Sequence, residues 1–299
     1  MITNLESIDR INPNKLLFKA GLSREELELI LNEGTLQNYC KSNMVKGDIH
    51  YSRNNNVIRE RIGQIEKAPY YYNYLKNKGL SPTLLLHGVE NCAPVLNGLI
   101  EQFSTRENWR FGNVTCSISD IQSSIGFHAD IFEVMLVQLE GKRTWEFWKE
   151  DNMNPDYLSS LKKGLLVEAK AKTKSEADYI FELEPGDILY IPPYWGHFGT
   201  TGDNLSSVSL SFSWIIFTPY MLVSTIIKAL PQLDQDMIES NTDFFKPYFP
   251  SEFKKEELDF FIFSLFNDTI NKINKKISLN KVKECTRTCL INFSKNKDL

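Results

Sequence analysis

The stretch Gly126-Phe-His-Ala-Asp-Ile-Phe-Glu-Val-Met-Leu-Val-Gln138 places a His-x-Asp pair directly before an apolar run. Because successive side chains of a β-strand point to opposite faces, His128 and Asp130 leave such a segment by the same face and can converge on one ion. His197, in Trp195-Gly-His-Phe198, is the candidate third ligand. A His-x-Asp pair also arises by chance, so the residues alone predict only a candidate metal site on strands.

The sequence around both arms of this candidate site predicts β-structure. The apolar run after Asp130, a turn that contains Gly141 and an alternating segment that begins at Arg143 are typical of a β-hairpin. Pro185-Gly186 marks another turn, and a short apolar run follows it. Strands are expected at 131–138, 143–148, 187–191 and 204–214.

An ordered set of motifs resembles the JmjC and cupin-like branch of the 2-oxoglutarate oxygenases, in particular the bacterial ribosomal-protein hydroxylases. The motifs are His128-x-Asp130, Gln138…Gly141-x-Arg143-x-Trp145, Pro185-Gly-Asp187, Tyr190-Ile-Pro-Pro193 and His197, with Thr83 to Val89 and Asn108-Trp-Arg110 upstream. The likeness covers about residues 82 to 214. It implies a mainly β (α+β) fold, with a double-stranded β-helix (jelly-roll or cupin) core and helical segments at both ends.

The resemblance also implies a set of site residues and cofactors. His128, Asp130 and His197 would bind Fe(II) as two imidazoles and one carboxylate, a set that leaves positions open for a co-substrate and O₂. Arg143 would hold the distal carboxylate of 2-oxoglutarate through its planar fork of donors, unless it is a surface arginine. Ser119 would hydrogen-bond the same carboxylate, unless the backbone satisfies it.

The activity implied is hydroxylation of an unactivated C–H bond, and the substrate is the open question. The resembled hydroxylases are longer, and their usual Gly-Phe-Arg stands here as Ser211-Phe-Ser213. We therefore expect a free amino acid such as lysine, as in peptide natural-product biosynthesis. The alternatives are a peptidyl, ribosomal-protein-type hydroxylase and a non-catalytic cupin-like metal-binding or sensor protein. Trp195, Glu133 and Asp120 are the weak candidates for substrate contacts.

Composition limits the partners. The 299 residues carry a net charge of −4, with a pI near 5.7, which gives no electrostatic footprint for nucleic acid. Charged side chains interrupt the apolar positions of Met1 to Ala20, so neither a signal peptide nor a membrane partner is expected. The five scattered cysteines favour a reducing, cytoplasmic location.

We expect three parts along the chain. They are a helical lead-in at 1–80, the oxygenase core at 81–214 and a helical C-terminal segment at 215–299. The lead-in contains a helix that begins at the capping box Ser23-Arg-Glu-Glu26, and a polar stretch at 42–61 that is either an exposed loop or a lid. A helix is expected at 91–103, and another at about 256–277 whose apolar face could pair two copies as a homodimer. His87 is expected to be a satisfied core histidine.

Overall fold

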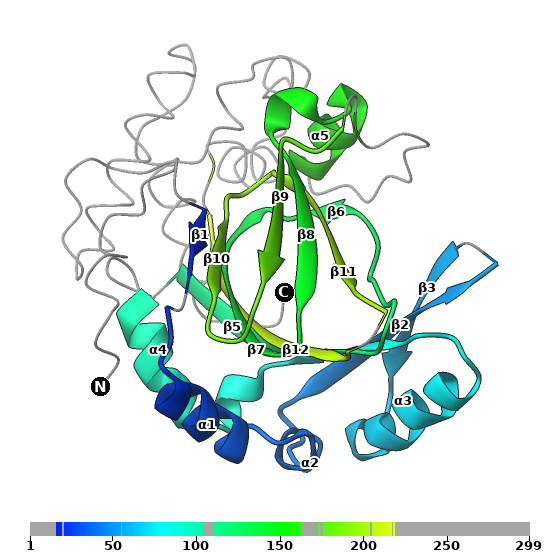
Figure 1. The fold of residues 1–299 in the computed structure, drawn as a ribbon, viewed down its shortest axis with the longest axis vertical. Coiled ribbons are helices and arrows are strands. Elements are labelled where there is room, and N and C mark those ends of the chain that lie inside the picture. Colours follow the sequence, from blue (N-terminus) through cyan, green and yellow to red (C-terminus); the bar gives the residue numbers. More distant parts are fainter. Residues whose placement is uncertain are drawn as a thin grey trace, which may run out of the picture. The chain divides into compact units, whose positions relative to one another are not determined.

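The structure is a computed structural model, and it describes residues 16–19, 21–54, 56–103, 110–162, 173, 176–203, 205–216 and 218 (Figure 1). The chain divides into two compact units, one of residues 1–105 and 112–214, the other of residues 106–111 and 215–299. The second unit lies almost wholly outside the described residues, and so does the helix expected at 256–277. The three-part division therefore stays a prediction.

Two antiparallel sheets form the described unit. The strands are β1 (Leu17–Phe18), β2 (Lys46–Arg53), β3 (Asn56–Ile62), β4 (Thr83–His87), β5 (Phe111–Ser119), β6 (His128–Ala129), β7 (Phe132–Glu140), β8 (Arg143–Trp148), β9 (Tyr179–Leu183), β10 (Ile188–Ile191), β11 (Gly196–Thr201) and β12 (Ser207–Ile215). The large sheet has the order β1-β10-β7-β12-β5-β4-β2-β3, and the small sheet has the order β6-β11-β8-β9. This arrangement confirms the mainly β, jelly-roll fold that the resemblance implied.

The helices cover the large sheet and flank the small one. They are α1 (Arg24–Glu33), α2 (Leu36–Tyr39), α3 (Ala68–Asn77), α4 (Val95–Phe103) and α5 (Pro155–Lys162), with short 3-10 turns at Ile65–Lys67, Val89–Asn91 and Glu150–Asn152. In Figure 1, α1 to α4 follow the lower edge of the view and α5 lies at the opposite end, beside β8 and β9. Among the described residues, no helix is both long enough and apolar enough to span a membrane.

The two faces of the large sheet differ in chemistry. Ile49 of β2 and Leu84 and Leu86 of β4 are fully buried on one face, where α3 packs against these strands. The Arg143 side chain of β8, in the small sheet, donates to the Ser117 hydroxyl of β5 at 3.2 Å, so the Ser117 face looks toward the small sheet. Polar side chains line that inner face, and the core lies between the outer face and the helices.

Two local predictions are confirmed and two are wrong. The capping box at Ser23 is present, with reciprocal bonds to Glu26, and α4 covers most of the helix expected at 91–103. The expected hairpin is wrong, because β7 pairs in the large sheet while β8 pairs with β11 and β9. The turn at Gly141 (φ 67°) instead carries the chain from one sheet to the other.

The polar stretch at 42–61 is not an exposed loop, and its role as a lid stays a prediction. It forms β2 and most of β3, which pair with each other in register from Gly47–Ile62 to Arg53–Asn56. Its polar side chains alternate with buried apolar ones, because β2 is buried on both faces and one of those faces lines a polar interior.

Candidate metal centre

The small sheet brings the three predicted ligands together. His128 of β6 lies directly opposite His197 of β11, and Asp130 follows two residues after His128 on the same side. The two Nε2 atoms are 3.0 Å apart, and Asp130 Oδ2 lies 3.9 Å from His128 Nε2 and 3.5 Å from His197 Nε2. Among the described residues this is the only cluster of three such side chains close enough to share an ion.

The backbone orients both imidazoles for metal binding. His128 Nδ1 lies 3.1 Å from the Gly126 carbonyl, and His197 Nδ1 lies 3.1 Å from the Trp195 carbonyl. A carbonyl can only accept, so each Nδ1 carries the proton and each Nε2 presents a lone pair to the centre. Two lone pairs at 3.0 Å repel each other unless a cation lies between them. Two nitrogen ligands about 2.1 Å from an ion, at a right angle, are about 3.0 Å apart, so the site fits a divalent metal.

Burial keeps His197 in the form that binds a metal. Its side chain is 2% exposed, and burial, followed by the neighbouring His128, lowers the pKa of the His197 imidazole to about 4. At neutral pH this imidazole is therefore uncharged. Asp130 is one-third exposed, which leaves one side of the centre accessible.

Arg143 is a buried cation whose contacts are neutral groups. It is 2% exposed, and its guanidinium donates to Ser117 Oγ at 3.2 Å and to the Gly199 carbonyl at 3.5 Å. Its Nε and the nearby Trp145 Nε1 are buried donors with no hydrogen-bond partner among the described residues. Burial lowers the pKa of Arg143 to about 10, so it is still charged at neutral pH. A buried cation with unused donors nearby calls for an anionic ligand.

Trp145 lies between Arg143 and the triad. Arg143 stacks over Trp145, with its guanidinium carbon 4.8 Å from the ring centre, and the Trp145 ring lies 5.8 Å from the His197 ring. Gly199 makes room for this approach, because a β-carbon there would lie only 3.0 Å from both Arg143 Nε and Trp145. Arg143 and His197 therefore flank the same aromatic side chain, Trp145.

Ser119 is linked to Arg143 through the hydroxyl group of Ser117. It is fully buried, accepts from Thr83 Oγ1 at 3.1 Å and lies 3.4 Å from Ser117 Oγ. Ser117, which sequence reasoning missed, makes the contact with Arg143. The alternation of Thr115, Ser117 and Ser119 in β5 was the available signal, since all three side chains leave by the inner face.

The weak substrate candidates have partners within the fold. The Trp195 ring stacks on Tyr179, with centroids 5.9 Å apart. Glu133 accepts from the Tyr190 hydroxyl at 3.0 Å, and Asp120 forms an ion pair with Lys76 at 2.8 Å. Their roles in substrate binding stay predictions. His87 is satisfied as expected, with Nδ1 3.0 Å from Thr115 Oγ1 and Nε2 3.2 Å from Asp48 Oδ2.

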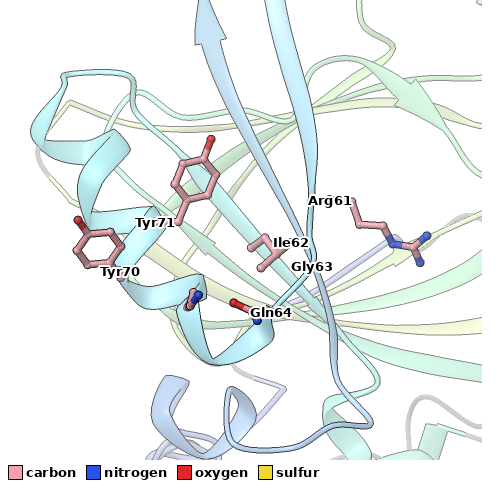
Figure 2. Close-up of a pocket in the computed structure, with 7 residues that line it drawn as sticks. Arg61, Ile62, Gly63, Gln64, Tyr70 and Tyr71 are labelled. Atoms are coloured by element: carbon pink, nitrogen blue, oxygen red, sulfur yellow. The ribbon is translucent and has the colours of Figure 1, made fainter.

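A separate hollow of about 400 Å³ lies between the end of β3 and the start of α3. Arg61, Tyr70 and Tyr71 are among its lining residues, and none of the metal ligands is. Figure 2 shows that the Arg61 guanidinium points away from both tyrosine rings. The charge of Arg61 therefore does not lie inside this hollow, and the hollow adds nothing to the metal centre.

A family model matches the part of the chain that carries this site. Residues 98–221 match the family model described as a JmjC domain. This segment includes His128, Asp130, Arg143 and His197.

Individual relatives narrow the comparison further. The chain is 29% identical over 155 residues to the ribosomal protein uL16 3-hydroxylase of Escherichia coli, a match that covers 50% of this chain and 38% of that protein. It is 26% identical over 163 residues to a probable ribosomal oxygenase of Haemophilus influenzae, covering 54% of this chain and again 38% of the relative. The match thus spans less than two-fifths of either relative.

Solved structures agree on the fold. The structure of YcfD, a ribosomal oxygenase from Escherichia coli, in complex with cobalt and 2-oxoglutarate, has a TM-score of 0.52 at 19% identity. It covers 92% of this chain, and this chain covers 66% of it. At this level of identity the likeness supports the fold alone.

Proposed function

We propose that this chain is an Fe(II)- and 2-oxoglutarate-dependent oxygenase that hydroxylates an aliphatic C–H bond of a residue within a protein. The observation that carries the proposal is the convergence of His128, Asp130 and His197 beside the buried, cationic Arg143. Two imidazoles and one carboxylate are the ligand set of non-haem Fe(II) oxygenases, and a buried guanidinium suits the far carboxylate of a dicarboxylic co-substrate.

The chain's own residues supply orientation and exclusion of water. His128 and His197 are held by backbone carbonyls, so their lone pairs are oriented before a metal arrives. Arg143 would fix one end of 2-oxoglutarate, which directs the keto-acid end toward the triad. Trp145 and Phe147 are buried beside His197 and keep bulk water from that side of the centre.

When bound, Fe(II) supplies the O₂ chemistry. In the overall reaction, 2-oxoglutarate, O₂ and the substrate C–H give succinate, CO₂ and the substrate C–OH. One oxygen atom of O₂ enters succinate, and the other enters the new hydroxyl group.

Two curated relatives support a protein substrate, because the names of both refer to ribosomal proteins or ribosomal oxygenases. They favour the peptidyl alternative over the free amino acid that the sequence analysis placed first. Ser213, which stands where the resembled family has arginine, bonds with the backbone of Asn113 and fills no charged role. Because this departure from the family pattern was one reason to expect a free amino acid, that class of substrate is kept as the second one to test.

The experiment supplies iron, 2-oxoglutarate and air to the protein with three separate probes: purified ribosomal protein uL16, a total extract of bacterial ribosomal proteins, and pooled free amino acids. We expect succinate, and one added oxygen atom by mass spectrometry on a ribosomal protein, with neither in the His128→Ala variant. Oxygen on a free amino acid alone would move the substrate to the second class. Metal binding without succinate under any condition would support a sensor and contradict the oxygenase.

A further inference from the structure

A row of polar side chains crosses the inner face of the large sheet and leads away from Arg143. Strand register pairs Ser119 of β5 with Thr83 of β4, Thr83 with His50 of β2, and His50 with Arg59 of β3. Directly paired residues in antiparallel strands place their side chains on the same face, with about 4.8 Å between strands. Since the Ser119 face looks toward the small sheet, His50 does too.

His50 is buried and incompletely bonded. It is 8% exposed, and its Nε2 has no hydrogen-bond partner among the residues that the structure describes. A buried polar atom left without a partner costs about 1–3 kcal/mol, so such atoms usually serve a ligand, a water molecule or an ion.

The neighbours of His50 are committed elsewhere. The Thr83 hydroxyl bonds with Ser119 Oγ and Ser123 Oγ. The Asp48 carboxylate, two residues before His50 on the same face, accepts from Arg59 at 2.6 Å and lies 3.2 Å from His87. Neither can turn to His50 without losing a bond that it already makes.

The surroundings of His50 link it with the candidate site and define its protonation state. Burial, then Arg59, lowers the pKa of His50 to about 4, and the His128 imidazole contributes to the lowering. Val57, two residues before Arg59 on the same face of β3, lies 3.4 Å from where a β-carbon of Gly126 would stand, so this face reaches the segment that carries His128. His50 itself is neutral at pH 7. A neutral imidazole has one N–H to donate. Arg59 and Arg61, which lie on this face beyond it, favour an oxygen acceptor over a cation.

We propose that His50 Nε2 donates a hydrogen bond to a carbonyl oxygen of the substrate, and so positions the substrate between the metal centre and the β3 edge of the large sheet. This inference rests on the proposed function and adds a substrate-positioning residue to it. A carbonyl acceptor suits a polypeptide substrate, which presents one at every residue.

The test compares three variants of the iron-loaded protein, with the ribosomal protein that gains oxygen in the wild type as substrate. His50→Phe removes the donor, His50→Gln keeps an N–H in a similar position, and Tyr51→Phe is the control. Tyr51 is the adjacent residue on the opposite face, and its hydroxyl bonds with Glu60. Each variant is first checked for wild-type thermal unfolding and wild-type affinity for 2-oxoglutarate.

We expect His50→Phe to raise the KM for the protein substrate about tenfold, the factor for a lost bond of about 1.4 kcal/mol. It should also raise the ratio of succinate to hydroxylated product, because a misplaced substrate wastes turnovers. His50→Gln should recover most of the loss, and Tyr51→Phe should leave KM and coupling unchanged.

Two outcomes overturn the inference and are distinguishable. If the His50→Phe variant has the same turnover, KM and coupling as the wild type, His50 does not contact the substrate, and a water molecule or packing alone accounts for its burial. Absence of succinate and product in the wild type itself would contradict the proposed function, and this inference with it.

Discussion

Replacement of Arg143 by methionine should stabilise the ligand-free protein while it removes 2-oxoglutarate binding. Lowering the pKa of a guanidinium from 12.5 to about 10 corresponds to about 3 kcal/mol against the charged form on folding. The Arg143→Met variant would remove this cost but would also lose the contacts with Ser117 and Gly199, each worth about 1 kcal/mol. The Ser117 hydroxyl can turn to Ser119, so the net gain is about 1–2 kcal/mol.

The loss in binding follows from the same geometry. A bidentate, charge-assisted contact contributes about 3 kcal/mol or more, so the Kd for 2-oxoglutarate should rise at least about 100-fold. Urea unfolding of the metal-free protein and calorimetric titration of the manganese-loaded protein measure the two effects. Arg24→Met is the control, because Arg24 is an exposed residue with one ion pair and its loss should change stability by less than about 0.5 kcal/mol. A destabilised Arg143→Met with wild-type affinity would refute the reasoning, since the guanidinium would then serve the fold alone.

Further predictions concern the ligands, a turn and pH. His128→Ala and Asp130→Ala should abolish turnover and weaken iron binding while the circular dichroism spectrum stays that of the wild type; retained activity in either would contradict the ligand assignment. Gly141→Ala should destabilise the protein by about 3 kcal/mol or more in urea unfolding, because its φ is 67° and a β-carbon there overlaps a backbone carbonyl oxygen. In chelator-treated protein, the folded pKa values of His50 and His197 lie near 4, below the unfolded value of 6.5. The unfolded state therefore takes up protons first as the pH falls, and stability should drop between about pH 6.5 and 4 by up to about 3 kcal/mol per histidine; a flat profile over this range would contradict their burial.

Two of the three candidate ligands, His128 and Asp130, could be paired from the sequence because their geometry is local, whereas His197 joins them only through the pairing of β6 with β11. The spacing of two between His128 and Asp130 fixes a shared face on any strand, and the apolar run that follows predicts that strand. The assignment of Arg143 came from the resemblance, and the structure adds its burial and its unused donors.

Strand pairing could not be predicted in the same way. A short turn with glycine is compatible both with a hairpin and with a crossing between two sheets, and the choice depends on partners far along the chain. Here Arg143 pairs opposite Thr201 of β11 and not with β7. Local pattern contains no information about that partner.

The polar inner face explains the other failure. A strand that lines a ligand site has polar residues on a buried side, so the buried Asp48 and His50 made residues 42–61 resemble an exposed loop. Hydrophobic periodicity identifies a face that packs against a core, and it does not identify a face that packs against a ligand. The wrong prediction therefore fell at residues that we now place in the candidate site.

The most direct test of the central claim is an anaerobic titration of the protein with Fe(II) and then with 2-oxoglutarate, followed by visible absorption. We predict one iron per chain and a metal-to-ligand band that appears only when both are present, is absent in His197→Ala and needs far more 2-oxoglutarate in Arg143→Met. A wild-type protein that binds no iron, or binds iron with no such band, would contradict the assignment of these residues to an iron and 2-oxoglutarate site.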